Sequence, residues 1–402
     1  MKERNLDFDM VVERRGSDSL KFDFAKERGL PADVLPFWVA DMDFRISGFI
    51  QDALIRQVQH GIYGYTETRE NYKAVIAKWM KRRNDWDIRD YQLVKTPGVV
   101  PAIGAAVEAF TEKGDAVLIQ QPVYYCFSEV IRLCNRRVVS SDLLLTVDAE
   151  EKLRYVIDFE DFERKIVEEK VKLFLLCNPH NPGGRVWTRK ELEHLAEICY
   201  RHHVIVVSDE IHSDLIFPGH KHTVFATVSP EAEEITVTCT SPGKTFNISG
   251  LQIGNVLIKN RRLWLDFKRT LNGSCGYSQA NAAGIAACEA AYKYGEEWYK
   301  GVLSYIHENL EYLKDYLKKY LPMLGLMEPE ATFLVFLDFR KLHLSTGEEK
   351  DLIVNKAKLW LDSGEVFGEP GRGFERINIA CPRSVLTEAL ERLRSALADW
   401  AA

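Results

Sequence analysis

The fold of this chain is decided by a short stretch, Thr240-Ser241-Pro242-Gly243-Lys244-Thr245-Phe246-Asn247. It follows an apolar, β-branched run, Ile235–Cys239, which indicates a buried strand. A lysine directly after a core strand, on a loop of small residues, is poorly placed as a surface charge. Its flexible amine forms Schiff bases with carbonyl compounds, and burial readily shifts its pKa. Because Ser-x-x-Lys also occurs in unrelated enzymes, the rest of the sequence has to support a role for Lys244.

The composition is that of a globular protein. The 402 residues are 46% hydrophobic and 28% charged, and this length indicates two domains or one large one. A formal net charge of −6 implies no broad basic face, so nucleic acid is a poor partner. The polar N-terminus lacks the apolar core of a signal peptide, and no run reaches transmembrane length. The eight scattered cysteines form no C-x-x-C pair, which is typical of a reducing compartment, so we predict a cytoplasmic protein without membrane contacts.

Short apolar runs separated by helical patterns predict a mostly parallel sheet that is covered on both faces. Ser47 is expected to cap a helix that stops at Gly61, and Thr188 and Glu191 are expected to form a capping box. Further helices are expected around 72–80 and from the break at 97–101 to residue 110. The predicted strands are 93–96, 116–119, 172–177, 204–207, 235–239 and 252–258.

The pattern of elements changes near residue 295. A long helix is expected from around Glu296, and strands at 332–337 and 376–380 alternate with helices near 349–361 and 384–399. We therefore predict a large domain, 47–290, and a smaller α+β domain, 291–402, with an N-terminal segment, 1–46, packing against the small domain. The apolar run Phe37–Phe44 in that segment must be covered by the body of the protein or by a second subunit.

In parallel sheets of this kind, ligands bind at the carboxyl ends of the strands. Five residues that follow the predicted strands gather at this edge: Gly98, Tyr124, Asn181, Asp209 and Lys244. Together they match the needs of pyridoxal 5′-phosphate (PLP). Lys244 supplies the amine for a Schiff base, and Asp209 supplies an anion for the ring nitrogen. Asn181 can donate to the ring hydroxyl, and Tyr124 can cover the face of the ring.

The phosphate group needs backbone N–H groups at the start of a helix, and Gly98-Val99-Val100 offers them, with Ser241 nearby. Each residue also has a purely structural interpretation. Asp209 could cap a helix, Asn181 could serve a turn between prolines, and Tyr124 could belong to the core. The cofactor interpretation is favoured because all of its roles are filled at once, at strand ends and in a plausible order.

Two further features of the sequence involve histidine. His212 could be a hydrogen-bonded core histidine. His202-His203 precede a strand with no third ligand in view, so no metal site is predicted.

Several segments carry a resemblance to a known family. Three of them resemble the successive signatures of fold-type I PLP-dependent enzymes of the class I/II aminotransferase superfamily: Asn178-Pro-His-Asn-Pro-Gly-Gly184, Ser208-Asp-Glu-Ile-His212 and Ser241-Pro-Gly-Lys-Thr-Phe-Asn247. Three others resemble its MalY/PatB-like cystathionine β-lyase branch: Phe37–Phe44, Gly64-Tyr65-Thr66 and Phe367–Arg383. The resemblance covers nearly the whole chain.

The resemblance implies roles for individual residues. Lys244 would form the Schiff base with PLP and later act as the base at the substrate Cα, and Asp209 would pair with the ring nitrogen with support from His212. Arg376 would bind the substrate carboxylate as a bidentate fork, and Arg372 and Arg383 are alternative candidates for this role. The other implied contacts are Asn181 to the ring hydroxyl and the substrate, Tyr124 to the ring, Val99, Val100 and Ser241 to the phosphate, and Tyr65 reaching over from a partner subunit.

The resemblance also implies an architecture and an assembly. We expect a large domain whose mostly parallel seven-stranded sheet lies between helices, a smaller α+β domain, and a homodimer with the active site at the subunit interface. The chain departs from the family pattern in two places, of which Gly183-Gly184, where the superfamily often has Thr-Gly, is expected to have little consequence. Many aminotransferases carry an arginine eight residues after the lysine, where it binds phosphate, whereas this chain has Gln252. That difference argues mildly against an ordinary transaminase.

The implied function is that of a PLP-dependent carbon–sulfur β-lyase. It would cleave L-cystathionine, or related cysteine S-conjugates, to a thiol (homocysteine from cystathionine), pyruvate and ammonia. Two alternatives stay open. One is a class I/II aminotransferase. The other is a regulatory protein that binds a protein partner and keeps lyase activity as a secondary trait.

Overall fold

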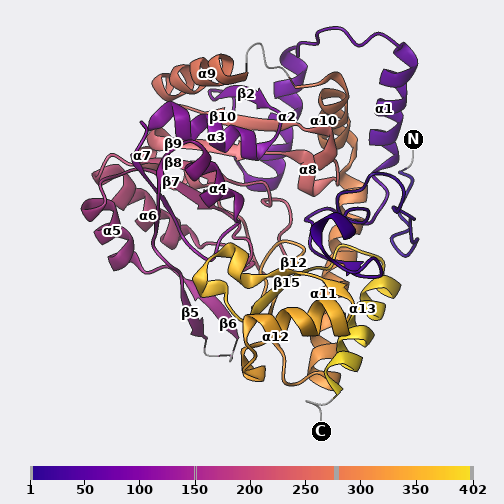
Figure 1. Ribbon diagram of the computed structural model, residues 1–402. Coiled ribbons are helices and arrows are strands. Elements are labelled where there is room, and N and C mark those ends of the chain that lie inside the picture. The colour runs from indigo at the N-terminus through magenta and orange to yellow at the C-terminus, as the bar shows by residue number, and fades with distance from the viewer. Residues whose placement is uncertain (1–2, 149, 151, 276–279, 399–402) are drawn as a thin grey trace.

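The structure is a computed structural model that describes residues 3–148, 150, 152–275 and 280–398. Figure 1 shows a larger body built around one sheet and a smaller body formed by the C-terminal part of the chain, with the N-terminal segment lying beside both. We propose the predicted boundaries, 1–46, 47–290 and 291–402, for these parts. Among the described residues, no helix is both long enough and apolar enough to cross a membrane.

The central sheet has seven strands in the order β2-β10-β9-β8-β7-β3-β4. Only β10 runs antiparallel to its neighbours, so the carboxyl ends of the other six strands meet at one edge. The expected seven-stranded, mostly parallel sheet is therefore confirmed. Its strands are β2 (Gln92–Thr96), β3 (Ala116–Ile119), β4 (Arg137–Ser140), β7 (Val171–Cys177), β8 (Ile205–Asp209), β9 (Thr236–Thr240) and β10 (Gly254–Ile258).

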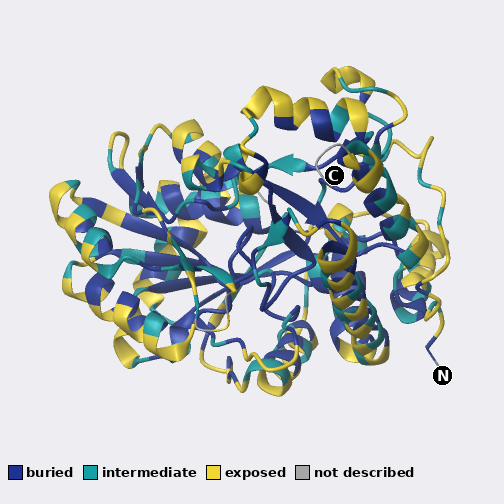
Figure 2. Cartoon of the chain, turned by 90° about the horizontal axis from the view of Figure 1, so that it is seen from below, coloured by how far each residue is buried: buried dark blue, intermediate teal, exposed yellow. Residues whose placement is uncertain are grey.

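One strand, β4, was not predicted. It lies at the edge of the sheet, where only Val139 among its four residues is buried, so its apolar pattern is weak. The interior strands follow the predicted ones closely because they are buried on both faces and have continuous apolar runs. Figure 2 shows these strands as buried, whereas the surrounding helices turn one buried side inward and one exposed side outward.

Helices cover both faces of this sheet. On one face, α3 (Val99–Phe110), α4 (Cys126–Leu133) and α9 (Arg261–Cys275) pack on side chains such as Val117 and Leu175. On the other, α5 (Phe159–Glu168) and α6 (Arg189–Arg201) pack on side chains such as Leu118 and Leu176. The capping box of Thr188 and Glu191 at the start of α6 is present as predicted. A hairpin, β5 (Leu144–Val147) and β6 (Leu153–Val156), and helix α7 (Pro230–Ile235) complete this part.

Three further helices flank the sheet on the N-terminal side of the molecule. Ser47 caps α1 (Gly48–His60), which ends at Gly61 with a φ of 72°, as the sequence predicted. The helix expected around 72–80 is α2 (Glu70–Asn84). Helix α1 packs on α10 (Ala282–Tyr294).

The smaller body holds a four-stranded sheet in the order β11-β12-β15-β14. Its core strands are β12 (Leu334–Asp338) and β15 (Phe374–Asn378), with β11 (Gly325–Leu326) and β14 (Asp362–Ser363) at the edges. The helix predicted from Glu296 is α11 (Glu296–Tyr320), and α13 (Arg383–Ala396) closes the chain.

One helix prediction was wrong in part. In place of a helix over 349–361, α12 (Thr346–Lys350) continues as a π-helical turn to Lys356, and Leu359–Trp360 form a short strand, β13. This strand pairs with β1 (Leu35–Pro36) of the N-terminal segment. A partner more than 300 residues away in sequence, which local patterns do not reveal, therefore decides the conformation of this stretch.

Candidate active site

A cavity of about 220 Å³ opens at the carboxyl ends of the sheet strands. Eight of the ten predicted site residues line it: Val99, Val100, Tyr124, Asn181, Asp209, His212, Ser241 and Lys244, together with Gly98. Sequence reasoning missed Ala40, Ser249 and Ile253, which also line it. Ala40 comes from the N-terminal segment, and only the tertiary structure brings it to the sheet.

Lys244 lies on a single helical turn, α8 (Pro242–Thr245), directly after β9. Ser241 caps this turn, since its Oγ accepts from the Gly243 amide at 2.9 Å and donates to the Ile253 carbonyl at 2.7 Å. The Lys244 Nζ donates to the Ala40 carbonyl at 2.5 Å. Burial lowers the pKa of Lys244 to about 8, although nearby Asp41 acts to raise it. The amine therefore loses its proton more readily than an exposed lysine does.

Asp209 ends strand β8 and is buried beneath the same cavity. Its Oδ1 accepts from the Ile211 amide at 3.1 Å, and no ion pair to it is found among the described residues. Burial raises the pKa of Asp209 to about 7, while the Ile211 amide and Lys244 oppose the shift. A cationic ring nitrogen would give this carboxylate the partner that it lacks.

His212 lies in the same buried layer, and its ring meets the Phe333 ring edge to face at 6.1 Å. Burial lowers the pKa of His212 to about 3, so the imidazole is neutral. Its Nδ1 is buried with no hydrogen-bond partner among the described residues. A buried polar atom without a partner is costly, so it favours a ligand group in the adjoining cavity.

The start of α3 supplies an anion site. Gly98 has a φ of 134°, which favours glycine, and the first-turn amides of Val99 and Val100 are left free by helix geometry. Close packing also requires glycine on the neighbouring strand, because a Cβ on Gly254 would lie 2.5 Å from the Thr96 hydroxyl. Helix start, buried amine and buried carboxylate thus surround one cavity, and these residues fit the phosphate, aldehyde and ring nitrogen of PLP.

Asn181 and Arg376 are linked beside the cavity. The Asn181 Oδ1 accepts from the Arg376 Nη1 at 3.1 Å, so its Nδ2 is the group available to a ring hydroxyl. The Arg376 Nη2 donates to the Trp38 carbonyl at 2.8 Å and forms an ion pair with Asp362. The Arg376 Nε is buried with no partner among the described residues. A substrate carboxylate at Arg376 would therefore share the guanidinium with Asp362.

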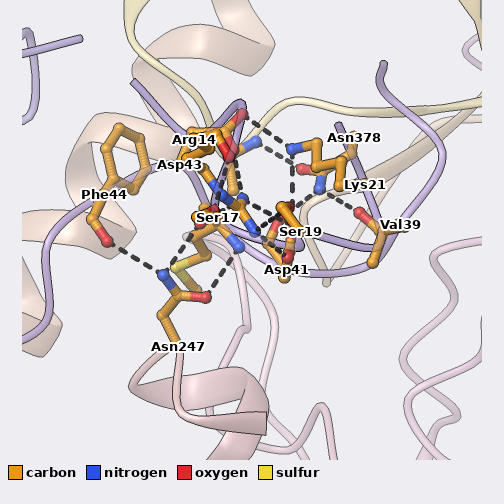
Figure 3. A network of polar contacts seen from close by, with 12 residues as sticks. Arg14, Ser17, Ser19, Lys21, Val39, Asp41, Asp43, Phe44, Asn247 and Asn378 are labelled. Carbon is orange, nitrogen blue, oxygen red and sulfur yellow. Dashed lines mark hydrogen bonds and ion pairs between the residues drawn. The ribbon is translucent and has the colours of Figure 1, made fainter. Parts of the chain in front are cut away.

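The polar network in Figure 3 holds the N-terminal segment, whose Ala40 carbonyl accepts from Lys244. Arg14 forms ion pairs with Asp41 at 2.6 Å and with Asp43 at 2.7 Å. The fully buried Lys21 binds Asp43 at 2.8 Å. Asn378 of β15 donates to the carbonyls of Val39 and Asp41, at 2.7 and 2.6 Å. These contacts fix the backbone on both sides of Ala40.

Asn247 holds the same segment from the lysine loop. Its Nδ2 donates to the carbonyls of Met42 and Phe44, at 2.9 and 3.0 Å, and its Oδ1 accepts from the Met42 amide at 2.9 Å. The run Phe37–Phe44, which the sequence required to be covered, is thus covered largely by this chain's own body. The two aspartates within that apolar run were the one sequence signal of the network.

We predict that Asn247→Gly lowers the free energy of unfolding by about 1–3 kcal/mol, because three backbone groups lose their partners. Glycine accepts the φ of 55° found at Asn247, so the loss reports the hydrogen bonds and not backbone strain. Denaturant unfolding of the unmodified protein and of Asn247→Gly measures this loss of stability. The matched control is Asn71→Gly at an exposed helix position, and equal losses in the two variants would contradict the prediction.

Comparison with known proteins agrees with this geometry. Residues 47–393 match the family described as aminotransferase class I and II. The chain belongs to the class I and II aminotransferase family. It is 41% identical to cystathionine β-lyase PatB of Bacillus subtilis (strain 168), over 98% of this chain and 100% of PatB, and 32% identical to protein MalY of Escherichia coli (strain K12), over 97% and 98%. The crystal structure of cystalysin from Treponema denticola, which contains PLP, superposes with a TM-score of 0.92 at 37% identity, over 98% and 99% of the two chains.

Two predicted site residues of this aminotransferase-family chain lie outside the cavity, namely Tyr65 and Arg376. Tyr65 is 98% exposed on the segment after α1. The two alternative candidates for binding the substrate carboxylate, Arg372 and Arg383, pair with other residues. Arg372 pairs at the surface with Glu365 and Glu369, whereas the Arg383 Nε donates to the Asn309 Oδ1 at 2.6 Å. Gln252 is exposed and does not line the cavity.

Proposed function

We propose that this protein is a PLP-dependent carbon–sulfur β-lyase that cleaves L-cystathionine or related cysteine S-conjugates to a thiol, pyruvate and ammonia. The observation that carries the proposal is the full-length similarity to PatB, a cystathionine β-lyase. The cavity supports it, because a buried amine and a buried carboxylate face the same space at the carboxyl edge of the sheet.

PLP, when bound, supplies an electron sink for the negative charge that develops at the substrate Cα. Lys244 would hold it covalently, with Asp209 at the ring nitrogen and Asn181 at the ring hydroxyl. The amides of Val99 and Val100, with the Ser241 loop, would hold its phosphate.

The chain's own residues then handle the proton and the substrate. The Lys244 Nζ, with its lowered pKa, is suited to remove the Cα proton near neutral pH. The Asp209 carboxylate would favour a proton on the ring nitrogen of bound PLP. Arg376 orients the substrate carboxylate, and the half-buried Tyr124 beside Asn181 forms one wall of the cavity. The Ala40 carbonyl can accept a hydrogen bond from the lysine amine whenever that amine is free.

A product assay tests the lyase assignment. Purified protein with PLP and L-cystathionine, in the absence of any 2-oxo acid, is expected to release thiol, pyruvate and ammonia in equal and sustained amounts. If nothing is released until a 2-oxo acid is added, and an amino group is then transferred, the protein is an aminotransferase and the lyase proposal fails.

We further propose a homodimer in which Tyr65 completes the partner's site. Figure 1 shows α1 and the segment that follows it on the outer edge of the molecule. Large apolar side chains are exposed there: Ile55, Val58, Ile62, Tyr63 and Tyr65. An exposed apolar strip of this kind favours association with a second surface.

We predict a dimeric mass in solution and a Tyr65→Phe variant that stays dimeric but binds PLP about tenfold more weakly, because one donor to the phosphate is lost. Light scattering and cofactor titration measure the two effects. Tyr63→Phe, three residues from the end of α1, is the control. A monomer, or PLP affinity equal to that of the unmodified protein, would contradict this arrangement.

We also propose a cytoplasmic location, which is supported by the free thiols of the seven described cysteines. A regulatory protein partner stays a prediction from the sequence.

A further inference from the structure

A second hollow, of about 410 Å³, lies away from the active-site cavity, between the end of α2, residues 216–220 and the first half of α11. We call it the Arg83 groove. Its lining residues with basic side chains are Arg83, His220, Lys300 and His307, and no carboxylate is among the residues that line it. On a chain with a net charge of −6, such a groove is locally suited to an anion.

Arg83 is incompletely paired. One of its terminal nitrogens donates to the Tyr299 hydroxyl, and its Cζ lies 4.6 Å from the Tyr299 ring. Its Nε is buried, yet it lies 3.8 Å from the Asp214 Oδ1, which is too far for a hydrogen bond. Arg83 thus lines the groove with a guanidinium whose hydrogen bonding is incomplete, and the planar fork of a guanidinium suits phosphate oxygens.

The remaining lining residues give the Arg83 groove an apolar side and further donors. Phe217 and Pro218 give the groove an apolar side, and the Phe217 ring lies 5.5 Å from the His307 ring. Lys300 is held by Glu296 at 3.1 Å, outside the lining, which leaves Arg83 and the two histidines as the main donors. Several donors beside an aromatic wall favour a doubly charged group on an organic body over a bare ion.

We propose that the Arg83 groove binds a small phosphomonoester and that its occupancy is transmitted to Lys244. The connection runs through Asp214, which is buried and accepts from the Trp79 indole at 3.0 Å and from the Thr245 hydroxyl at 2.8 Å. Thr245 is the residue next to Lys244. A ligand that draws Arg83 away from Asp214 changes the field and the hydrogen bonding at the lysine turn. This transmission, unlike the binding itself, rests on the proposed function.

Calorimetric titration of the PLP-bound protein with phenyl phosphate tests the site, because bound PLP fills the cavity's own phosphate position. We expect saturable binding that Arg83→Gln and His307→Gln each weaken about tenfold or more. Arg132→Gln, at an exposed arginine on α4, should leave it unchanged. If no saturable heat is seen, or if both groove variants bind as the unmodified protein does, the site is overturned.

The visible absorbance of the Lys244-bound cofactor, followed against pH, tests the transmission. Saturating phenyl phosphate is expected to shift this titration. Thr245→Val should bind the ligand with unchanged affinity but lose the shift, because it breaks the contact to Asp214 without altering the groove. If phenyl phosphate binds to the unmodified protein without any spectral shift, the transmission is overturned. If phenyl phosphate does not bind at all, the groove proposal fails but the lyase proposal is unaffected.

Discussion

Replacing Lys244 by alanine is expected to lower kcat for β-elimination by about 10⁴-fold. The side chain is half-buried and lines the cavity, and no other lysine lines that cavity. No neighbouring residue can replace Lys244 in binding PLP covalently or in removing the Cα proton. Thiol release from L-cystathionine measures the loss, and the visible band of the Lys244-bound cofactor should disappear at the same time.

The control for this experiment is Lys113→Ala, which removes an exposed lysine and should leave kcat unchanged. Thermal unfolding shows whether the Lys244 variant is folded, and added methylamine provides a replacement amine. A folded Lys244→Ala protein that keeps both the band and the activity would refute the assigned role of this lysine.

Asp209→Asn is expected to lower kcat by about 10²–10³-fold with a smaller change in KM. Asparagine keeps the size of the side chain and its contact with the Ile211 amide, but it carries no charge to hold a proton on the ring nitrogen. The effect should therefore fall on the step in which charge develops, and steady-state kinetics separate it from binding. An unchanged kcat would show that the carboxylate does not act on the cofactor.

The same variant tests the electrostatics of the site without any activity. Asp209 titrates near 7 in the fold because of burial, whereas an exposed aspartate titrates near 3.9. The folded, PLP-free chain thus binds a proton that the unfolded chain has lost, so this contribution to stability is present below about pH 4 and is lost as pH rises through about 7.

We predict that the stability of PLP-free wild-type protein, relative to Asp209→Asn, falls by roughly 2–4 kcal/mol between pH 4.5 and 7.5. Denaturant unfolding at both pH values measures the difference. Asp315→Asn, at an exposed position on α11, should show no such trend. A difference that is constant with pH, or that rises with it, would mean that burial does not control this carboxyl.

Much of the fold was predictable because its signals are local. The Ser47 side chain caps the start of α1, and Gly61 ends this helix with a positive φ. A capping box of Thr188 and Glu191 starts α6. The strands that end at Asp209 and before Lys244 are rich in β-branched residues and almost wholly buried, since a sheet covered on both faces buries nearly every side chain. Parallel strands then bring their carboxyl ends to one edge, and this places most of the site residues together.

The sequence by itself determined the apolar runs that become strands and the residues that cap the helices. It also determined three groups that surround the cavity, namely the Lys244 amine, the Asp209 carboxylate and the start of α3. Only the tertiary structure decided that the Ala40 carbonyl meets Lys244, that Asp362 shares Arg376, and that Leu359–Trp360 form a strand with Leu35–Pro36. The physical reason is that each of these contacts joins residues on separate elements, which are brought together only when strands pair or when the N-terminal segment packs on the rest of the chain. No periodicity or cap encodes such a contact, and it forms only when the two segments are packed against each other.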